Sequence, residues 1–324
     1  MGRPMLSLIA AAGHVGKYFT HSLLGTGKHT VTALTRPGSK NVLPEGVKAI
    51  AVDYTDESSL VEALKGQQVL IITLNVRAPS DTASKLHRAA AEAGVPWVIP
   101  NIYGQDPADE TFAQESLYGI QGKGYMKEIE SLGVSSYVVL SGGYWYEFSL
   151  GGSVNHFGFD LREKKVHLLD NGEAKLTTST WDQYGRACAA LLSLKELPED
   201  ADDISPTLSQ WRNGTVYIGS FTISQREMFE SVKRVTGTTD ADWTITSENS
   251  HTRWQKAMED LKGGDRSAYV RIMYTRSFFP DGAGNSEAKY GLANEALGLP
   301  KEDLDDRTKE AVRLALSGEL NTYG

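Results

Sequence analysis

The chain has very little cysteine, since Cys188 is the only one among 324 residues. A single thiol cannot form an intramolecular disulfide, so a disulfide framework is excluded and a reducing compartment is favoured. Cys188 lies in the apolar run ACAALL, which predicts a small buried side chain on a helix. The alternative is a reactive thiol, which would need an exposed, electropositive setting.

Long apolar runs and basic runs are also missing. No stretch reaches the roughly 18 apolar residues of a membrane helix, and the start MGRPMLSLIA lacks the apolar core and cleavage site of a secretory signal. The 41 acidic residues outnumber the 33 basic ones, which disfavours a nucleic-acid or anionic-membrane surface. We therefore expect a cytoplasmic protein, a monomer or homodimer, whose partner is a small molecule.

Metal-binding and hydrolase patterns are missing as well. The seven histidines are scattered without the H-x-x-x-H or cysteine-rich spacing of a zinc site. The chain has no G-x-S-x-G nucleophile elbow and no evident pair of catalytic carboxylates. We expect no metal site.

The first half of the chain alternates short β-branched runs with segments of helical periodicity, which is typical of repeated βαβ units. With right-handed crossovers this predicts an α/β fold, a Rossmann-type doubly wound parallel sheet. The predicted strands are 5–10, 30–35, 47–52, 69–74, 97–100 and 137–141, and the helices begin near Gly13, Asp56, Ser80 and Phe112.

After Ser141 the alternation changes. The sequence predicts a hairpin over 165–180, a helix opened by Asp182, a strand over 215–220 and a helix over 224–237. We place the functional division near residue 150. Residues 1–150 form the sheet domain, and residues 151–324 form a smaller α+β substrate region, parts of which pack back on the sheet.

The stretch IAAAGHVGKY joins the first predicted strand to its helix. Small residues at such a turn let backbone amides and the positive helix end approach a pyrophosphate. The spacing is a variant of G-x-x-G-x-x-G with alanine first. The alternative is a plain strand-to-helix turn. The candidate phosphate-binding residues are Ala10, Ala12, Gly13, His14, Val15 and Gly16.

Arg36 ends the second predicted strand, where a dinucleotide fold meets the adenosine ribose. An acidic residue there favours NAD, whereas arginine suits a 2′-phosphate, so we expect NADP(H). The alternative is a solvated turn arginine. Asp53, next to Tyr54 after the third strand, is a candidate adenine contact or a helix cap.

The fourth and fifth predicted strands end in polar residues at the ligand edge of such a sheet. Asparagines after a strand also serve as turn residues that bond their own backbone, so both interpretations stay open. The candidate cofactor contacts there are Thr73, Leu74, Asn75 and Asn101, and Tyr103 is a candidate substrate contact.

Most of the first half resembles the NmrA-like and isoflavone-reductase-like family of atypical short-chain dehydrogenases/reductases. The resemblance rests on AAGHVGKYFTHSLL, VTALTR, GVKAIAVDYTDESSLVEALKGQQVLI, KLHRAAAEAGVPWVIPNIYG and KGYMKEIESLGVSSYVVLSGGYW. It implies a Rossmann domain with a smaller substrate region, NADPH in the strand-end crevice, and reduction of an aromatic or otherwise apolar molecule. The family also contains members similar to redox sensors, which bind a protein partner.

Lys123 matches the position of a lysine early in the helix before the sixth strand of such reductases. The resemblance implies that it holds the ribose hydroxyls and supplies positive charge or a relayed proton to the substrate. A solvated surface lysine is the alternative. The Tyr-x-x-x-Lys dyad of ordinary short-chain dehydrogenases is not matched, because Tyr118 and Lys123 are five positions apart, roughly 140° around a helix; Tyr118 is predicted to be structural.

The segment SGGYWYEF follows the sixth predicted strand directly. Gly142 and Gly143 are expected to let the chain pass close to the nicotinamide. The aromatic side chains of Tyr144, Trp145 and Tyr146 are expected to point into the crevice as walls for a planar substrate, with Tyr144 or Tyr146 as proton donor. The alternative is that they wedge the two regions together.

Two functions are consistent with these patterns. The first is an NADPH-dependent reductase of a small aromatic or otherwise apolar metabolite, acting on a carbonyl or an activated double bond, with Lys123 as its cationic group. The second is a non-catalytic NADP(H)-binding redox sensor, which would bind a protein partner according to the state of its cofactor.

Overall fold

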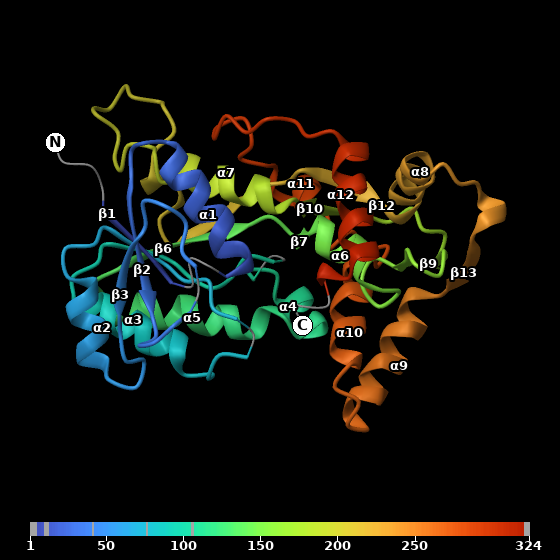
Figure 1. The fold of residues 1–324 in the computed structure, drawn as a ribbon, viewed down its shortest axis with the longest axis horizontal. Helices are drawn as coiled ribbons and strands as arrows, with labels where there is room; N and C mark the ends of the chain where they lie inside the picture. The colour runs from blue at the N-terminus through green and yellow to red at the C-terminus, as the bar shows by residue number, and fades with distance from the viewer. Residues whose placement is uncertain (1–4, 10–12, 41, 76, 105–106, 321–324) are drawn as a thin grey trace.

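The computed structural model describes residues 5–9, 13–40, 42–75, 77–104 and 107–320, and it places a sheet region beside a second region (Figure 1). The sheet has seven strands in the order β11-β6-β5-β4-β1-β2-β3, and all neighbours are parallel. From β3 to β6 this is the Rossmann order, so the predicted fold class is confirmed. The strands are β1 (Met5–Ile9), β2 (Thr30–Thr35), β3 (Lys48–Ala51), β4 (Val69–Ile71), β5 (Trp97–Ile99), β6 (Ser136–Ser141) and β11 (Gly214–Tyr217).

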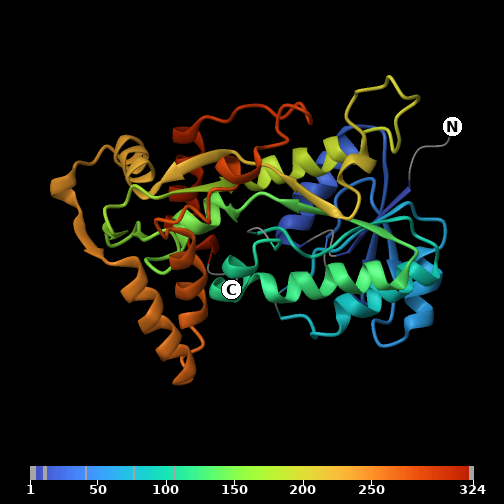
Figure 2. The ribbon, with the colours of Figure 1, turned by 180° about the vertical axis from the view of Figure 1, so that it is seen from behind.

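Helices cover both faces of this sheet (Figures 1 and 2). Phe19, Tyr184 and Cys188 belong to the buried cluster on one face, and Leu60 and Leu86 to the cluster on the other. Cys188 is completely buried, as the sequence predicted, and burial raises the pKa of its thiol. One face carries α1 (His14–Gly25) and α7 (Trp181–Leu191), and the other carries α2 (Glu57–Leu64), α3 (Thr82–Glu92) and α5 (Gly119–Leu132).

The helix starts agree with the sequence at α1, at α2 and at α3, whose N-cap Asp81 lies next to the predicted Ser80, and they differ further along. Asp56 caps α2, because its side chain accepts from the N–H of Ser58. The helix predicted from Phe112 is two helices, α4 (Glu110–Ser116) and α5, since Leu117 between them is left-handed with a φ of 61°. The cap of α7 is Thr180, whose hydroxyl accepts from the N–H of Gln183, so the start predicted at Asp182 is wrong.

The second region is built on two three-stranded sheets, β12-β10-β7 and β13-β9-β8. The predicted hairpin over 165–180 is wrong, because β9 and β10 belong to different sheets: β9 pairs with β8 and β13, and β10 pairs with β7 and β12. The strands are β7 (Tyr144–Trp145), β8 (Phe159–Asp160), β9 (Lys165–Leu169), β10 (Lys175–Ser179), β12 (Phe221–Ser224) and β13 (Thr244–Glu248). The helices are α6 (Tyr146–Gly152), α8 (Gln225–Thr236), α9 (Ser250–Lys262), α10 (Ala268–Ser277), α11 (Ser286–Tyr290) and α12 (Leu304–Ser317).

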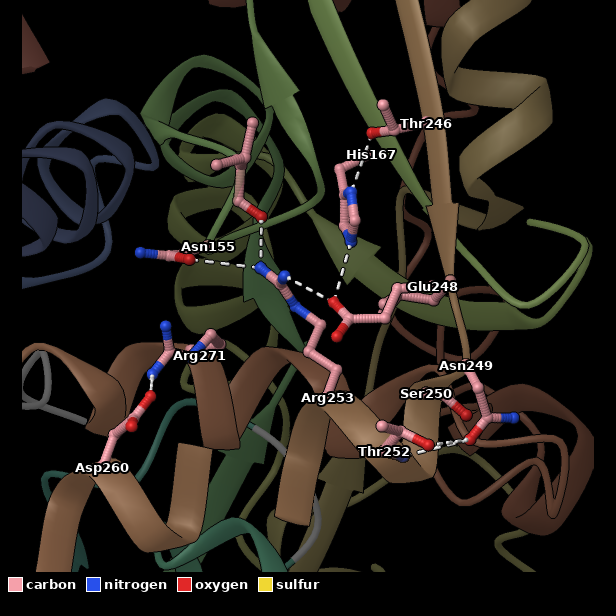
Figure 3. Close-up of polar contacts among 12 residues, drawn as sticks. Asn155, His167, Thr246, Glu248, Asn249, Ser250, Thr252, Arg253, Asp260 and Arg271 are labelled. Atoms are coloured by element: carbon pink, nitrogen blue, oxygen red, sulfur yellow. Dashed lines mark hydrogen bonds and ion pairs between the residues drawn. The ribbon is translucent and has the colours of Figure 1, made fainter. Parts of the chain in front are cut away.

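Arg253 ties α9 to the rest of the second region (Figure 3). Its guanidinium donates to the carbonyl of Val154 at 3.0 Å and to Asn155 at 3.1 Å, and it lies 3.3 Å from the carboxylate of Glu248. The same carboxylate contacts His167 at 3.2 Å. Burial, and then the charge of Arg253, lower the pKa of His167, so the ring is neutral at pH 7 and the cluster serves packing.

Two segments of the later chain return to the Rossmann sheet. Strand β11 extends it beside β6, and α7 packs against α1. The approach of these helices is close: a Cβ added to Gly185 would lie 2.6 Å from the hydroxyl oxygen of Ser22 and 2.7 Å from the carbonyl oxygen of Tyr18. The division near residue 150 stays a prediction about function.

A buried carboxylate holds the C-terminal segment against the start of α7. Glu302, with a side chain 3% exposed, accepts from Thr180 at 2.7 Å and pairs with Arg186 at 2.7 Å and Arg307 at 3.0 Å. Glu147 lies nearby and accepts from the N–H of Trp181 at 3.3 Å. Burial raises the pKa of Glu147 to about 8.

Across the residues that the structure describes, no helix combines the length and the apolar composition that crossing a membrane requires.

The first prediction concerns the contact between α1 and α7. Gly185→Ala places a methyl group against the backbone of Tyr18, so we expect the free energy of unfolding to fall by about 1–3 kcal/mol. Gly25→Ala is the control, because no atom lies within 4 Å of the added Cβ. Urea unfolding followed by circular dichroism measures both. Equal stability of the two variants would contradict the described packing.

The second prediction concerns the pH dependence of stability. With a folded pKa of about 8 for Glu147, the native state holds a proton that the unfolded chain releases near its ordinary pKa of 4.5. The free energy of unfolding therefore falls as the pH rises from about 5 to 8.5. We expect Glu147→Gln to reduce this fall by on the order of 2 kcal/mol. Urea unfolding at pH 5.5 and 8.5 measures it, and an unchanged fall in the variant would refute the assignment.

Candidate active site

The main cavity lies at the carboxyl edge of the parallel strands, where the strand order reverses between β1 and β4. Such switch points are where open α/β sheets bind ligands. The cavity has a volume of about 850 Å³ and is lined by Gly13 after β1, by the residues that follow β2, β3 and β4, and by the first turn of α3. The sheet topology alone thus brings these chain segments together.

The phosphate-loop prediction falls partly on this cavity. Ala10 and Ala12 lie outside the described residues. Gly13 lines the cavity as the extended N-cap of α1, so the first amides of a 12-residue helix start at its wall. Val15 and Gly16 are buried within the first turn.

His14, at the first position of α1, packs against Trp181 of α7 with 3.8 Å between ring centroids. Burial lowers the pKa of His14 to about 3, with a further contribution from the charge of Lys17. The ring is therefore neutral at pH 7. His14 can present its backbone amide to a phosphate, but it supplies no positive charge.

The residues after β2 and β3 form the outer end of the cavity. Arg36 is exposed there, beside the side chains of Asp53 and Tyr54. The Tyr54 hydroxyl donates to the carbonyl of Leu34 at 3.2 Å, and burial raises its pKa to about 12 despite the nearby charge of Arg36. Asp53 does not cap α2; it accepts from the backbone N–H of Thr55 at 2.8 Å.

Hydrogen bonds join the segments that follow β4 and β5. Asn101 accepts from the N–H of Leu74 at 3.1 Å and donates to its carbonyl at 3.3 Å. Asn75 lines the main cavity and accepts from the N–H of Arg77 at 2.8 Å, and Thr73 is buried. The two asparagines therefore form hydrogen bonds with backbone groups and also lie at the cavity wall. Their positions are consistent both with a turn role and with cofactor contact.

A second cavity of about 350 Å³ adjoins the first, and Leu74, Asn75, Ala78 and Pro79 line both. Its other walls come from both regions of the protein: Tyr118, Gln121, Gly122 and Tyr125 at the start of α5, and Tyr269 on α10. A small molecule in it would lie between aromatic rings and the strand ends.

Lys123 lines neither cavity. Its ammonium lies 3.6 Å from the carboxylate of Glu110 on α4, and the lysine side chain is 27% exposed. That carboxylate is 75% exposed, so the pair is a weak surface contact and leaves the lysine able to turn.

The expectation that the aromatic segment points into the crevice is wrong for its tyrosines. Tyr144 and Tyr146 are buried in the core of the second region. The Tyr144 hydroxyl donates to the carbonyl of Met273 at 2.9 Å, and that of Tyr146 bonds to Thr308 at 2.7 Å. Trp145 is half-buried and packs on Phe148. The two tyrosines thus pack within the second region, whereas Trp145 packs against the hydrophobic cluster on the α1 and α7 face of the sheet.

Tyr103 and the two glycines are also occupied by internal contacts. Tyr103 is buried, and its hydroxyl donates to the carbonyl of Ile72 at 2.7 Å, so it does not face a substrate. A Cβ added to Gly142 would lie 2.6 Å from the hydroxyl oxygen of Ser179. Gly143 has a φ of 71°, and an added Cβ would overlap the carbonyl oxygen of Thr177. Both glycines allow the close approach of β10.

Several residues at the cavities were missed by the sequence analysis. Arg77 and Lys85 line the main cavity, and Lys85 pairs with Asp81 at 2.7 Å. Tyr125 and Tyr269 line the smaller one. The two basic residues had a signal, since Arg77 comes shortly after the fourth strand and Lys85 lies in the first turn of the next helix, α3. Tyr269 had none, because only the fold brings α10 to this edge. Within the described residues, no cluster of histidine, cysteine, aspartate or glutamate has the arrangement of a metal site.

The fold defines a Rossmann-type protein whose two cavities lie at the switch point of the sheet, the place where such folds bind ligands. Residues 5–151 match the model of the NmrA-like family, which confirms the predicted resemblance over this part of the chain. The chain is also similar to the oxidoreductase aprR of Aspergillus flavus, with 25% identity over 305 residues that cover 92% of this chain and 95% of that protein.

Solved structures share the fold over almost the whole chain. AtPrR2 with NADP⁺ and (+)-pinoresinol has a TM-score of 0.71 at 18% identity and covers 95% of this chain and 98% of its own. An isoflavone reductase has a TM-score of 0.71 at 18% identity, covering 96% and 99%. An NADPH-dependent quinone oxidoreductase of Escherichia coli has a TM-score of 0.66 at 18% identity, covering 96% and 99%.

Proposed function

We propose that the protein is an NADP(H)-dependent oxidoreductase that reduces a carbonyl or an activated double bond of a small, planar, apolar metabolite. The observation that carries this proposal is the pair of adjoining cavities at the switch point of the sheet. The larger has an exposed arginine at the ribose end, and the smaller has tyrosine walls. An extended dinucleotide suits the first, and a planar molecule suits the second.

The residues of the larger cavity suit the successive parts of NADP(H). The amides after Gly13 would hold the pyrophosphate, and Arg36 would grip the 2′-phosphate. Asn75 and Asn101 lie where the second ribose would follow. When bound, NADPH supplies the hydride for the reduction. Oxidoreductase function is the role named for the similar A. flavus protein, which supports the proposal.

Lys123 remains our candidate for the cationic group. It lies on α5, the helix that also contributes Gln121 and Gly122 to the smaller cavity. For this role its side chain must leave Glu110 and turn toward the ribose and substrate. Positive charge there would stabilise the negative charge that develops on the substrate oxygen.

The third prediction concerns cofactor choice. Arg36→Ala removes the guanidinium from the ribose end, so we expect NADPH binding to weaken by about 1.5–3 kcal/mol while NADH binding stays nearly constant. Calorimetric titration measures both affinities. Lys40→Ala is the control, since it removes an exposed charge just beyond Arg36 without touching the cavity wall. Equal losses for NADPH and NADH in Arg36→Ala would contradict the 2′-phosphate assignment.

The fourth prediction separates the reductase from a redox sensor. The protein is incubated with an extract of host metabolites and NADPH deuterated at the transferable position, and mass spectrometry searches for labelled products. We expect label with the native protein and a loss of about tenfold or more with Lys123→Met, which keeps its NADPH affinity. Absence of label despite calorimetric NADPH binding would favour a sensor, whose partner should distinguish NADP⁺ from NADPH.

A further inference from the structure

Tyr118 lies at the junction of the two regions. It is the residue before α5, and it lines the smaller cavity together with Asn75 and Asn101 at the strand ends. Tyr269, on α10 of the second region, lines the same cavity. A molecule in this cavity would therefore touch Tyr118 while it lies next to the strand ends at which a dinucleotide would run.

The Tyr118 phenol lies against the backbone of Gly104. A Cβ added to Gly104, just past β5, would lie 2.5–2.7 Å from the ring and its hydroxyl oxygen, so the ring lies against this peptide. The backbone of Gly104 lowers the phenol pKa, which is the effect of a backbone N–H that stabilises the phenolate. The Gly104 carbonyl in turn accepts from Ser141 at 2.7 Å, which fixes the peptide.

The hydrogen of the Tyr118 hydroxyl is left for another acceptor. Among the residues that the structure describes, none accepts a hydrogen bond from it. By contrast, the hydroxyls of three buried neighbours donate to carbonyls inside the protein: Tyr103 to Ile72, Tyr144 to Met273 and Tyr184 to Gly143. Among the described residues, the Tyr118 hydroxyl therefore has a hydrogen left to donate.

The protonation state of the Tyr118 phenol suits a proton donor. Burial, and then the neighbouring Tyr269 phenol, raise the pKa of Tyr118 to about 12. The phenol is protonated at neutral pH. The Gly104 N–H stabilises the phenolate that forms once the proton has left, so the site is organised for both states of the acid.

We propose that Tyr118 is the proton donor of the reduction, with its hydroxyl directed at the substrate oxygen. This inference rests on the proposed function. As the hydride adds to the carbonyl carbon, the π electrons of the C=O bond move to the oxygen, and that oxygen takes the proton of Tyr118. The substrate is reduced to the alcohol, the dinucleotide is oxidised, and water in the cavity returns a proton to the phenolate. Lys123 then contributes charge and not the proton.

The experiment uses 9,10-phenanthrenequinone as the probe of a planar carbonyl, and it compares the native protein with Tyr118→Phe. Tyr137→Phe is the matched control. It removes a hydroxyl that bonds to Glu130 on α5, away from both cavities. Calorimetry gives the NADP⁺ affinity, which we expect to be equal in all three proteins. Thermal melts confirm that each is folded.

The first readout needs no turnover. With NADP⁺ present, we expect the infrared carbonyl band of the bound quinone to lie at lower wavenumber in the native protein and in Tyr137→Phe than in Tyr118→Phe. We also expect Tyr118→Phe to bind the quinone about tenfold more weakly than the native protein does. The second readout is NADPH consumption, which we expect to fall by about 10²- to 10⁴-fold in Tyr118→Phe alone.

The outcomes separate this inference from the proposed function. An unchanged carbonyl band and rate in Tyr118→Phe would overturn the role of Tyr118 and leave the reductase standing. Failure of the quinone to bind the native protein with NADP⁺ would also overturn it. A Tyr118-dependent band with no NADPH consumption by the native protein would support the phenol–carbonyl contact and count against the reduction.

Discussion

The hydroxyl of Tyr184 joins chain segments at the carboxyl edge of the sheet, where both cavities lie. It accepts from the N–H of Gly142 at 2.9 Å, and its single O–H lies between the carbonyls of Tyr103 and Gly143. One side chain on α7 thus joins the end of β5 to the turn between β6 and β7. Because α7 is completely buried at this point and packs on α1, the start of α1 and the far strand ends are held in one rigid arrangement.

The part of this arrangement that depends on local pattern could be predicted from the sequence. Strands such as Thr30–Thr35 are short apolar runs between turn signals, and Asp56 is a cap immediately before an amphipathic helix. The right-handed crossover then fixes which strand ends meet. The strand order therefore places Gly13 and Arg36 at the cavity, and no side-chain packing between distant segments is needed to predict their positions.

The rest could not be predicted because contacts distant in sequence decide it. The Lys165–Leu169 and Lys175–Ser179 strands look like a hairpin, but Lys175–Ser179 pairs with Phe221–Ser224 and with the strand of Tyr144. That pairing draws Tyr144 into the core, where Met273 and Ser277 satisfy its hydroxyl. An aromatic residue after a strand has the same sequence pattern whether it faces a ligand or a core, so only tertiary structure separates the two.

The break at Leu117 illustrates how a local conformation shapes the chemistry of the cavity. In a continuous helix from Glu110 to Leu132, the direction of residue 118 would be set by the helical repeat. The left-handed conformation of Leu117 instead ends one helix, and a new helix starts at Gly119. The first turn of that helix therefore faces the strand ends, and Tyr118 reaches the peptide of Gly104. The opposite wall comes from Tyr269, on a helix outside the Rossmann sheet. The larger cavity thus depends on the strand order, while the smaller one depends on this break and on α10, so the smaller can vary without disturbing the larger.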